Sequence, residues 1–357
     1  MEKFWGNDTL STQIKNELEK KIIPPCRLIV DSYGCGGLLF GLEIASDLLG
    51  REALNHPDFY ISFPVIISDK TSADFIKDFR DYFASNPYCS LSEWAQNINL
   101  SKNKQTTIGK REVDLIHEKM FLKPYEGKNK VCLIWSPESL NIVAANKLLK
   151  LIEEPPNNTY FILVSEEPEQ IIETIISRSN IIIIPPIKIE EMEEKLYKNG
   201  VKESNKIAIA SSGSWRKALQ LCKGSELTKN YEKLWITGLR IAFKCNVNKS
   251  SFISMLDWAE EVSKLNRDEQ KDLIQTALEI FRSALLINYN SGSVVTYISQ
   301  NNFELSKLAP FIHSSNALEL VDALEKSRFE IKRNANSKIL FSNLMIKISF
   351  LLNQKED

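Results

Sequence analysis

The chain has 357 residues, of which 43% are hydrophobic, and 45 Lys and Arg residues stand against 46 Asp and Glu, for a formal net charge of −1. This length is enough for two or three domains, and the composition excludes collagen-like, disordered and disulfide-scaffold proteins. The nearly neutral charge gives no reason to expect strong autonomous binding to nucleic acid.

The apolar runs have the length of strands and fall well below the roughly 20 residues that a membrane helix needs. Residues 1–8 carry charge where a signal peptide would be apolar. We therefore expect a cytoplasmic protein that does not contact a membrane, with free and mostly buried cysteines. The three histidines are scattered along the chain, which argues against a histidine metal centre or a Ser-His-Asp triad.

Short apolar runs alternate with amphipathic segments in the first half of the chain, a pattern typical of a parallel sheet flanked by helices. Several runs are apolar throughout, as in strands that are covered on both faces. The strands are predicted at residues 27–30, 60–63, 131–135, 160–164 and 181–184.

Two helices of this half have clear boundaries. One carries an apolar stripe from Leu38 to Leu49 and is followed by Gly50, a residue type that suits a C-terminal cap. The other follows Asn141, a suitable N-cap, and ends before Pro155-Pro156.

Strand patterns largely disappear after Pro185-Pro186, because two prolines in series end a strand. We predict an α/β domain at residues 1–186, a small three-helix domain at 187–228 and an all-α domain at 229–357. The expected helices are residues 189–198, 202–211 and 214–222, followed by longer ones that include 268–286, 317–332 and 337–352.

The segment after the first predicted strand has the position of a phosphate-binding loop. Against the pattern GxxxxGK[ST], Asp31 replaces the first glycine, Gly37 the lysine and Leu38 the hydroxyl residue. The lysine charge and the Mg²⁺-binding hydroxyl are therefore missing. We predict that the vestigial loop, Gly34, Cys35, Gly36 and Gly37, keeps its shape without binding nucleotide; the alternative is a working nucleotide site.

The third predicted strand lacks the acidic pair that orders Mg²⁺ and activates water in ATPases of this kind. Trp135 and Ser136 occupy those positions. Glu138 is a candidate substitute, but it lies beyond Pro137, and we interpret it as an exposed glutamate at the start of a helix.

The sequence of residues 144–156, together with 159–164, Pro168 and 174–179, closely resembles the clamp-loader ATPase family, and the resemblance covers about residues 20–225. It implies an AAA+ module, built from a five-stranded parallel sheet with flanking helices, followed by a three-helix lid and a C-terminal helical collar. In this family, the DNA polymerase III clamp loader uses ATP to place a sliding clamp on primed DNA. The implied partners are the delta and gamma/tau subunits in a hetero-pentameric ring, with the clamp and primed DNA reached through the complex.

The resemblance also assigns residue roles. A broken phosphate loop is typical of members that act as non-hydrolysing stators. Arg178, in the sequence Ser-Arg-Ser, would be an arginine finger that acts in trans on ATP held by a neighbouring subunit; the alternative is an arginine that neutralises carbonyls at a helix end. Arg216 matches the family's second sensor arginine. Because the first sensor position holds Glu166 and Glu167, which would repel phosphate, we expect Arg216 to form an ion pair or interface contact instead of sensing nucleotide.

No cofactor is expected, since ATP would be bound by partner subunits. Many relatives carry a four-cysteine zinc site, but Cys89 is the only cysteine between Gly50 and Lys110, so we expect no zinc. Two other functions remain as alternatives. One is an active AAA+ ATPase of the loader or of a related replication factor, and the other is a stand-alone DNA-binding module.

Overall fold

A computed structural model describes residues 3–65, 70–98, 106–223, 226–245, 251–289, 291, 295 and 297–354. These residues form two compact units, the first ending at Ala218 and the second beginning at Leu219. Within the described residues, no helix is long and apolar enough to cross a membrane.

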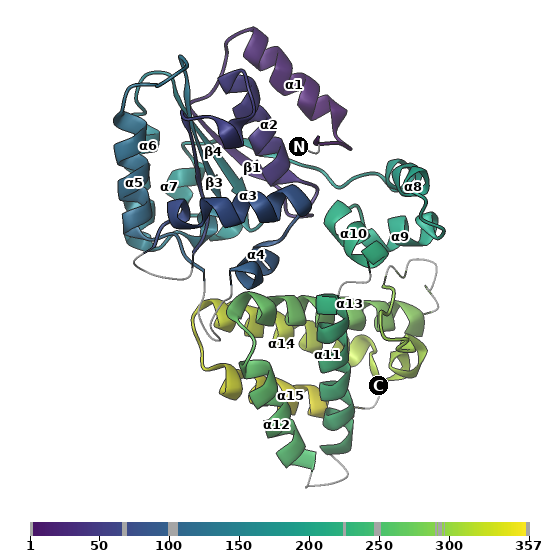
Figure 1. Ribbon diagram of the computed structural model, residues 1–357. Helices are drawn as coiled ribbons and strands as arrows, with labels where there is room; N and C mark the ends of the chain where they lie inside the picture. Colours follow the sequence, from purple (N-terminus) through teal and green to yellow (C-terminus); the bar gives the residue numbers. More distant parts are fainter. Residues whose placement is uncertain are drawn as a thin grey trace. The chain divides into compact units, whose positions relative to one another are not determined.

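The first unit contains one parallel sheet of five strands in the order β2-β3-β4-β1-β5 (Figure 1). The registers pair Leu28 of β1 with Leu163 of β4 and with Ile181 of β5. All five strands fall where the apolar runs predict them. The strands are β1 Cys26–Val30, β2 Phe59–Ser62, β3 Lys130–Trp135, β4 Thr159–Ser165 and β5 Asn180–Ile183.

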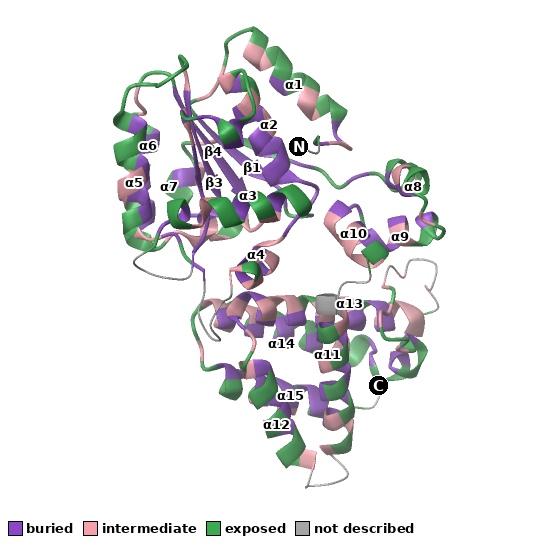
Figure 2. Cartoon of the chain, viewed as in Figure 1, coloured by how far each residue is buried: buried purple, intermediate pink, exposed green. Residues whose placement is uncertain are grey.

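Helices cover both faces of the sheet, which is why most strand residues are buried (Figure 2). One face packs on α5, α6 and α7 through a core that includes Leu28, Leu163 and Leu148. On the other face, α2 comes so close that Gly41 lies beside Val164. The α-helices around the sheet are α1 Asp8–Glu19, α2 Gly37–Leu49, α3 Ile76–Ser85, α4 Leu91–Asn97, α5 Lys110–Phe121, α6 Ile142–Glu153 and α7 Glu173–Ile176.

The predicted helix boundaries are confirmed at both caps. Gly50 ends α2 with φ of 75°, a left-handed conformation that glycine adopts readily. The side chain of Asn141 accepts a hydrogen bond from the backbone N–H of Ala144 at 2.8 Å.

After the sheet come three short helices, which we call the lid: α8 Ile189–Lys198, α9 Ser204–Ser211 and α10 Trp215–Lys223.

The second unit is helical in its described residues, as predicted. Its core holds an aromatic cluster in which Trp235 lies 5.8 Å from Phe281 and 6.2 Å from Trp258, measured between ring centroids. Its helices are α11 Glu226–Cys245, α12 Ser251–Ser263, α13 Arg267–Asn288, α14 Ser314–Lys332 and α15 Ser337–Leu351. The fold class is thus α/β plus all-α, while the division into three domains stays a prediction.

Candidate functional site

The loop between β1 and α2 is closed by its own aspartate. Oδ1 of Asp31 accepts a hydrogen bond from the backbone N–H of Cys35 at 2.8 Å. Oδ2 accepts from the N–H groups of Gly36 at 3.0 Å and Gly37 at 2.6 Å. Amides at the start of a helix are the groups that hold phosphate in a phosphate loop. Here a buried carboxylate, 2% exposed, takes that position.

Two of the loop glycines are required by their surroundings. Gly36 has φ of 103°, and a Cβ atom there would lie 2.7 Å from the ring of Tyr88. A Cβ atom on Gly37 would lie 2.6 Å from the Cβ atom of Asp31. The lysine of a phosphate loop therefore cannot stand at position 37 while Asp31 is in place, so the two departures from the motif are sterically coupled.

The remaining loop side chains belong to the core. Cys35 is fully buried, and its thiol donates a hydrogen bond to the carbonyl of Gly213 at 3.3 Å. Burial, assisted by the negative charge of Asp31, raises the pKa of Cys35 to about 12, so the thiolate is not formed at neutral pH. Leu38, at the position of the Mg²⁺-binding hydroxyl, is also buried.

Arg216 on α10 is held by hydrogen bonds on all sides of its guanidinium. Nη1 and Nη2 bind the two carboxylate oxygens of Glu166 at 2.8 and 2.5 Å. Nε donates to the carbonyl of Tyr88 at 2.7 Å, and Nη2 to that of Cys89 at 3.0 Å. Burial alone would lower the pKa of Arg216, but Glu166 outweighs it and holds the pKa above its usual range. Arg216 thus forms an ion pair, one of the two contacts expected for it.

Several acidic side chains lie near Arg216. Asp31 and Glu93 also lie close enough to raise its pKa. Glu138, which we expected to be exposed, is partly buried, and this prediction was wrong. Its Oε1 lies 3.4 Å from the backbone N of Glu166, while Oε2 is buried with no hydrogen-bond partner in the described chain. Burial raises the pKa of Glu138 to about 8, and the nearby Glu166 and Glu167 add to the shift.

The end of β3 carries no carboxylate at the positions of the acidic pair. Trp135 is 2% exposed, and its ring lies 6.1 Å from that of Phe79, so the indole fills the core. Ser136 is buried with a left-handed φ of 56°, and its N–H donates to the carbonyl of Val164 at 2.8 Å. Neither residue can supply the charge that orders Mg²⁺.

Arg178 lies just after α7 and is about two-fifths exposed. Its Nε pairs with Oε1 of Glu153, the last residue of α6, at 2.7 Å. Nη1 donates to the carbonyl of Thr174 at 3.1 Å, which is the helix-end contact that the alternative interpretation predicts. The structure therefore does not bring Arg178 together with Asp31 and Arg216, which form a separate cluster.

The sequence indicated the positions of this cluster and an ion pair for Arg216, but not which residues contact one another. The signal for the closed loop was an acidic residue in place of a glycine, a few positions before free backbone amides. For the pair of Arg216 with Glu166, the signal was an acidic residue at the first sensor position of a chain that keeps the arginine of the second.

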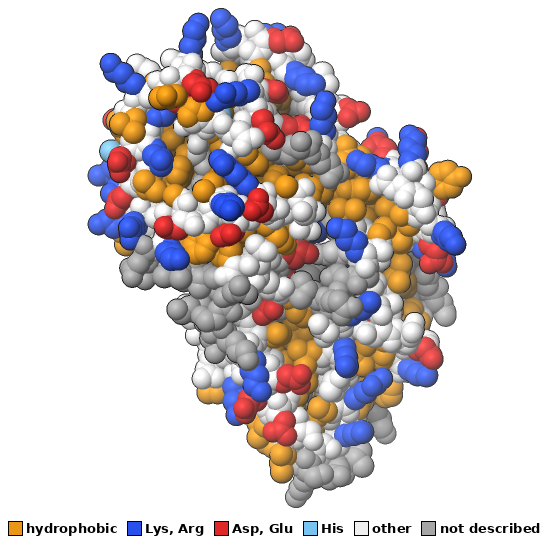
Figure 3. Space-filling model, viewed as in Figure 1, with side chains coloured by type: hydrophobic (Ala, Val, Ile, Leu, Met, Phe, Trp, Pro, Cys, Tyr) orange, Lys and Arg blue, Asp and Glu red, His pale blue; other side chains and the backbone are white. Residues whose placement is uncertain are grey.

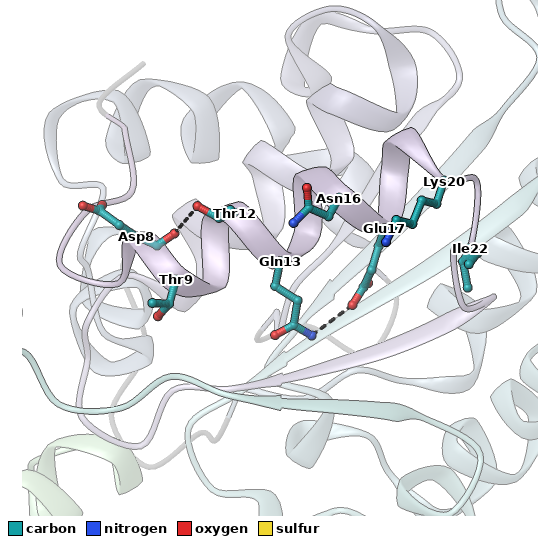
Figure 4. A pocket seen from close by; sticks show the side chains of 8 residues that line it. All are labelled: Asp8, Thr9, Thr12, Gln13, Asn16, Glu17, Lys20 and Ile22. Carbon is teal, nitrogen blue, oxygen red and sulfur yellow. Dashed lines mark hydrogen bonds between the residues drawn. The ribbon is translucent and has the colours of Figure 1, made fainter.

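Positive and negative side chains are interspersed on the face shown in Figure 3. In the described part of the chain, no three His, Cys, Asp or Glu residues are grouped as metal ligands. A hollow beside α1 is lined mostly by that helix, whose polar groups bond to one another: Thr12 to the Asp8 carbonyl at 2.8 Å and Gln13 to Glu17 at 3.0 Å (Figure 4).

The five-stranded parallel sheet and the helices that flank it define the fold of an AAA+ module. Residues 6–188 match the model of the family described as DNA polymerase III, delta subunit. The chain belongs to this family.

Curated relatives agree with this assignment. DNA polymerase III subunit delta′ of Buchnera aphidicola is 44% identical over 85 residues, which are 24% of this chain and 25% of the relative. Subunit tau of Bacillus subtilis is 29% identical over 262 residues, 67% of this chain and 46% of the relative. The matched segments thus span between a quarter and half of these relatives. A solved structure of a DNA polymerase III gamma subunit-related protein from Thermotoga maritima aligns with 96% of this chain and 100% of its own, with 16% identity and a TM-score of 0.40.

Proposed function

We propose that this chain is a delta-prime-type stator subunit of the DNA polymerase III clamp loader, which binds no nucleotide and donates Arg178 to ATP held by a neighbouring subunit. Its partners would be the delta and gamma/tau subunits of a hetero-pentameric ring, which loads the sliding clamp onto primed DNA. The observation that carries the proposal is the Asp31 carboxylate on the amides of residues 35–37.

A nucleotide phosphate would have to displace this carboxylate before it could bind. The displaced Asp31 would give up three hydrogen bonds, and bonds to charged groups each contribute about 1.5–3 kcal/mol. It would also remain beside the phosphate as a like charge, together with Glu166. With neither a lysine at position 37 nor an acid at Trp135, little would offset these costs.

The geometry of Arg178 supports a role in trans. A guanidinium has five N–H donors, and two of them are used by Glu153 and Thr174, which leaves three without a partner among the described residues. The side chain is 41% exposed, so these donors can be reached by a partner. A planar, permanently charged fork is suited to stabilise charge on a transferred phosphoryl group.

The test is clamp- and primed-DNA-stimulated ATP hydrolysis by a loader that is reconstituted with wild-type chain or with Arg178→Ala. The matched control is Arg51→Ala, because Arg51 pairs with Glu126 and is 49% exposed. At the one ATP site that Arg178 serves, we expect a fall of about 10³- to 10⁵-fold. Total turnover should fall less, since other sites in the ring remain, and the control should match wild type.

Two outcomes would contradict the proposal. Equal turnover with Arg178→Ala, in a loader that assembles normally, would reduce Arg178 to a residue that caps a helix end. Saturable ATP binding or hydrolysis by the isolated chain would support an active ATPase instead.

A further inference from the structure

The lid is joined to the sheet by a set of direct contacts around the loop remnant. The carbonyl of Gly213, just before α10, accepts hydrogen bonds from the Ile187 N–H at 3.0 Å and from the Cys35 thiol. The backbone N–H of Arg216 donates to the carbonyl of Gly34 at 3.1 Å. Beside them, the ring of Trp215 meets that of Trp5 edge to face, with centroids 4.6 Å apart.

The strongest of these contacts is the bidentate pair between Arg216 on the lid and Glu166 at the end of β4. The side chain of Arg216 is 17% exposed and that of Glu166 is 30% exposed, so the pair is largely shielded from water. Bidentate arginine–carboxylate pairs combine strength with a fixed geometry. If the carboxylate is removed, the guanidinium stays buried without its counter-charge, which is strongly unfavourable.

A carboxylate resembles a phosphate group in its negative charge and in its pair of acceptor oxygens. We infer that Glu166 acts as an internal anionic ligand of Arg216, in the place of a nucleotide phosphate, and that this pair holds α10 against the sheet without nucleotide. Glu166 is then a positioning residue for the lid. The inference deepens the proposed function, because a stator has to keep one shape while its neighbours bind and release ATP.

The test is hydrogen–deuterium exchange of the full chain, wild type against Glu166→Gln. The glutamine keeps the size of the side chain and removes its charge. We expect exchange of the amides in residues 34–37 and 214–217 to accelerate by about 10- to 100-fold, the range that corresponds to one lost charged hydrogen bond. Exchange within β3 should not change.

The control is Glu194→Gln, which removes an exposed carboxylate from an ion pair with Lys198 on the same lid. It should exchange like wild type. Arg216→Lys is the second variant, because lysine keeps the charge but cannot make the bidentate contact. It should accelerate the same amides, and it decides the question by itself if Glu166→Gln does not fold.

Unchanged exchange at residues 214–217 in a folded variant would overturn the inference, and so would an equal acceleration throughout β3, which reports general destabilisation. Adding ATP to the wild-type chain separates this failure from failure of the proposed function. Protection of residues 34–37 by ATP would count against the stator. No protection by ATP, together with unchanged exchange in Glu166→Gln, would count only against the role of Glu166.

Discussion

Glu153 and Arg178 form an ion pair that joins the last residue of α6 to the chain just beyond α7, with 2.7 Å between Oε1 and Nε. Because Glu153 fixes one side of the guanidinium, Glu153→Gln should lower clamp- and DNA-stimulated turnover in a reconstituted loader. The pair is half exposed, so we expect an effect of only about two- to fivefold. The adjacent and exposed Glu154, changed to Gln, is the control. Equal turnover in the wild-type, Glu153→Gln and Glu154→Gln loaders would show that Glu153 does not position Arg178 for catalysis.

Substitutions at positions 37 and 31 test whether the Asp31 side chain occupies the space that a lysine at position 37 would need. Gly37→Lys should lower the free energy of unfolding, since its side chain would start 2.6 Å from the Cβ atom of Asp31. Asp31→Gly alone should cost about 1–3 kcal/mol, because three amides lose their acceptor. In the double variant the collision is gone, so the two costs should not add, with a coupling of about 1–3 kcal/mol in urea unfolding. Simple additivity would show that the two residues do not share this space.

Glu138 should make stability depend on pH. Its pKa is about 8 in the folded chain and near the ordinary value of 4.5 when unfolded. Between these two values the folded chain holds a proton that the unfolded chain has released. Stability should therefore fall as pH rises from about 4.5 to 8, by at most about 1.4 kcal/mol per pH unit.

The measurement is the melting temperature of wild type and Glu138→Gln between pH 5 and 8.5. The neutral glutamine removes the titration, so its advantage over wild type should grow with pH over this range. A constant difference between the two proteins would mean that Glu138 is ionised in the folded chain.

Trp135 tests whether the ATPase acid could be restored. Trp135→Asp would leave a cavity beside Phe79 and bury a charge, so we expect a loss of at least about 3–5 kcal/mol in the free energy of unfolding. Trp135→Phe keeps an apolar ring and should lose considerably less. If the aspartate variant is as stable as the phenylalanine variant, this end of β3 is open enough for an acid.

The strands could be predicted because their apolar runs are continuous, and the caps at Gly50 and Asn141 because each residue type suits its local geometry. The missing loop and acid residues were equally visible in the sequence. The contacts that replaced them were not, since Glu166 meets Arg216 across 50 positions of the chain. Glu138 was misjudged for the same reason, because its burial depends on how the chain beyond β4 packs over it.

The shared space of Asp31 and Gly37 also limits the order in which this loop can accept substitutions. A lysine introduced first collides with the aspartate, and an aspartate removed first leaves buried amides without an acceptor. Each single substitution toward a nucleotide-binding loop should therefore give a less stable protein. At least two coordinated substitutions therefore separate this loop from one with a lysine at position 37.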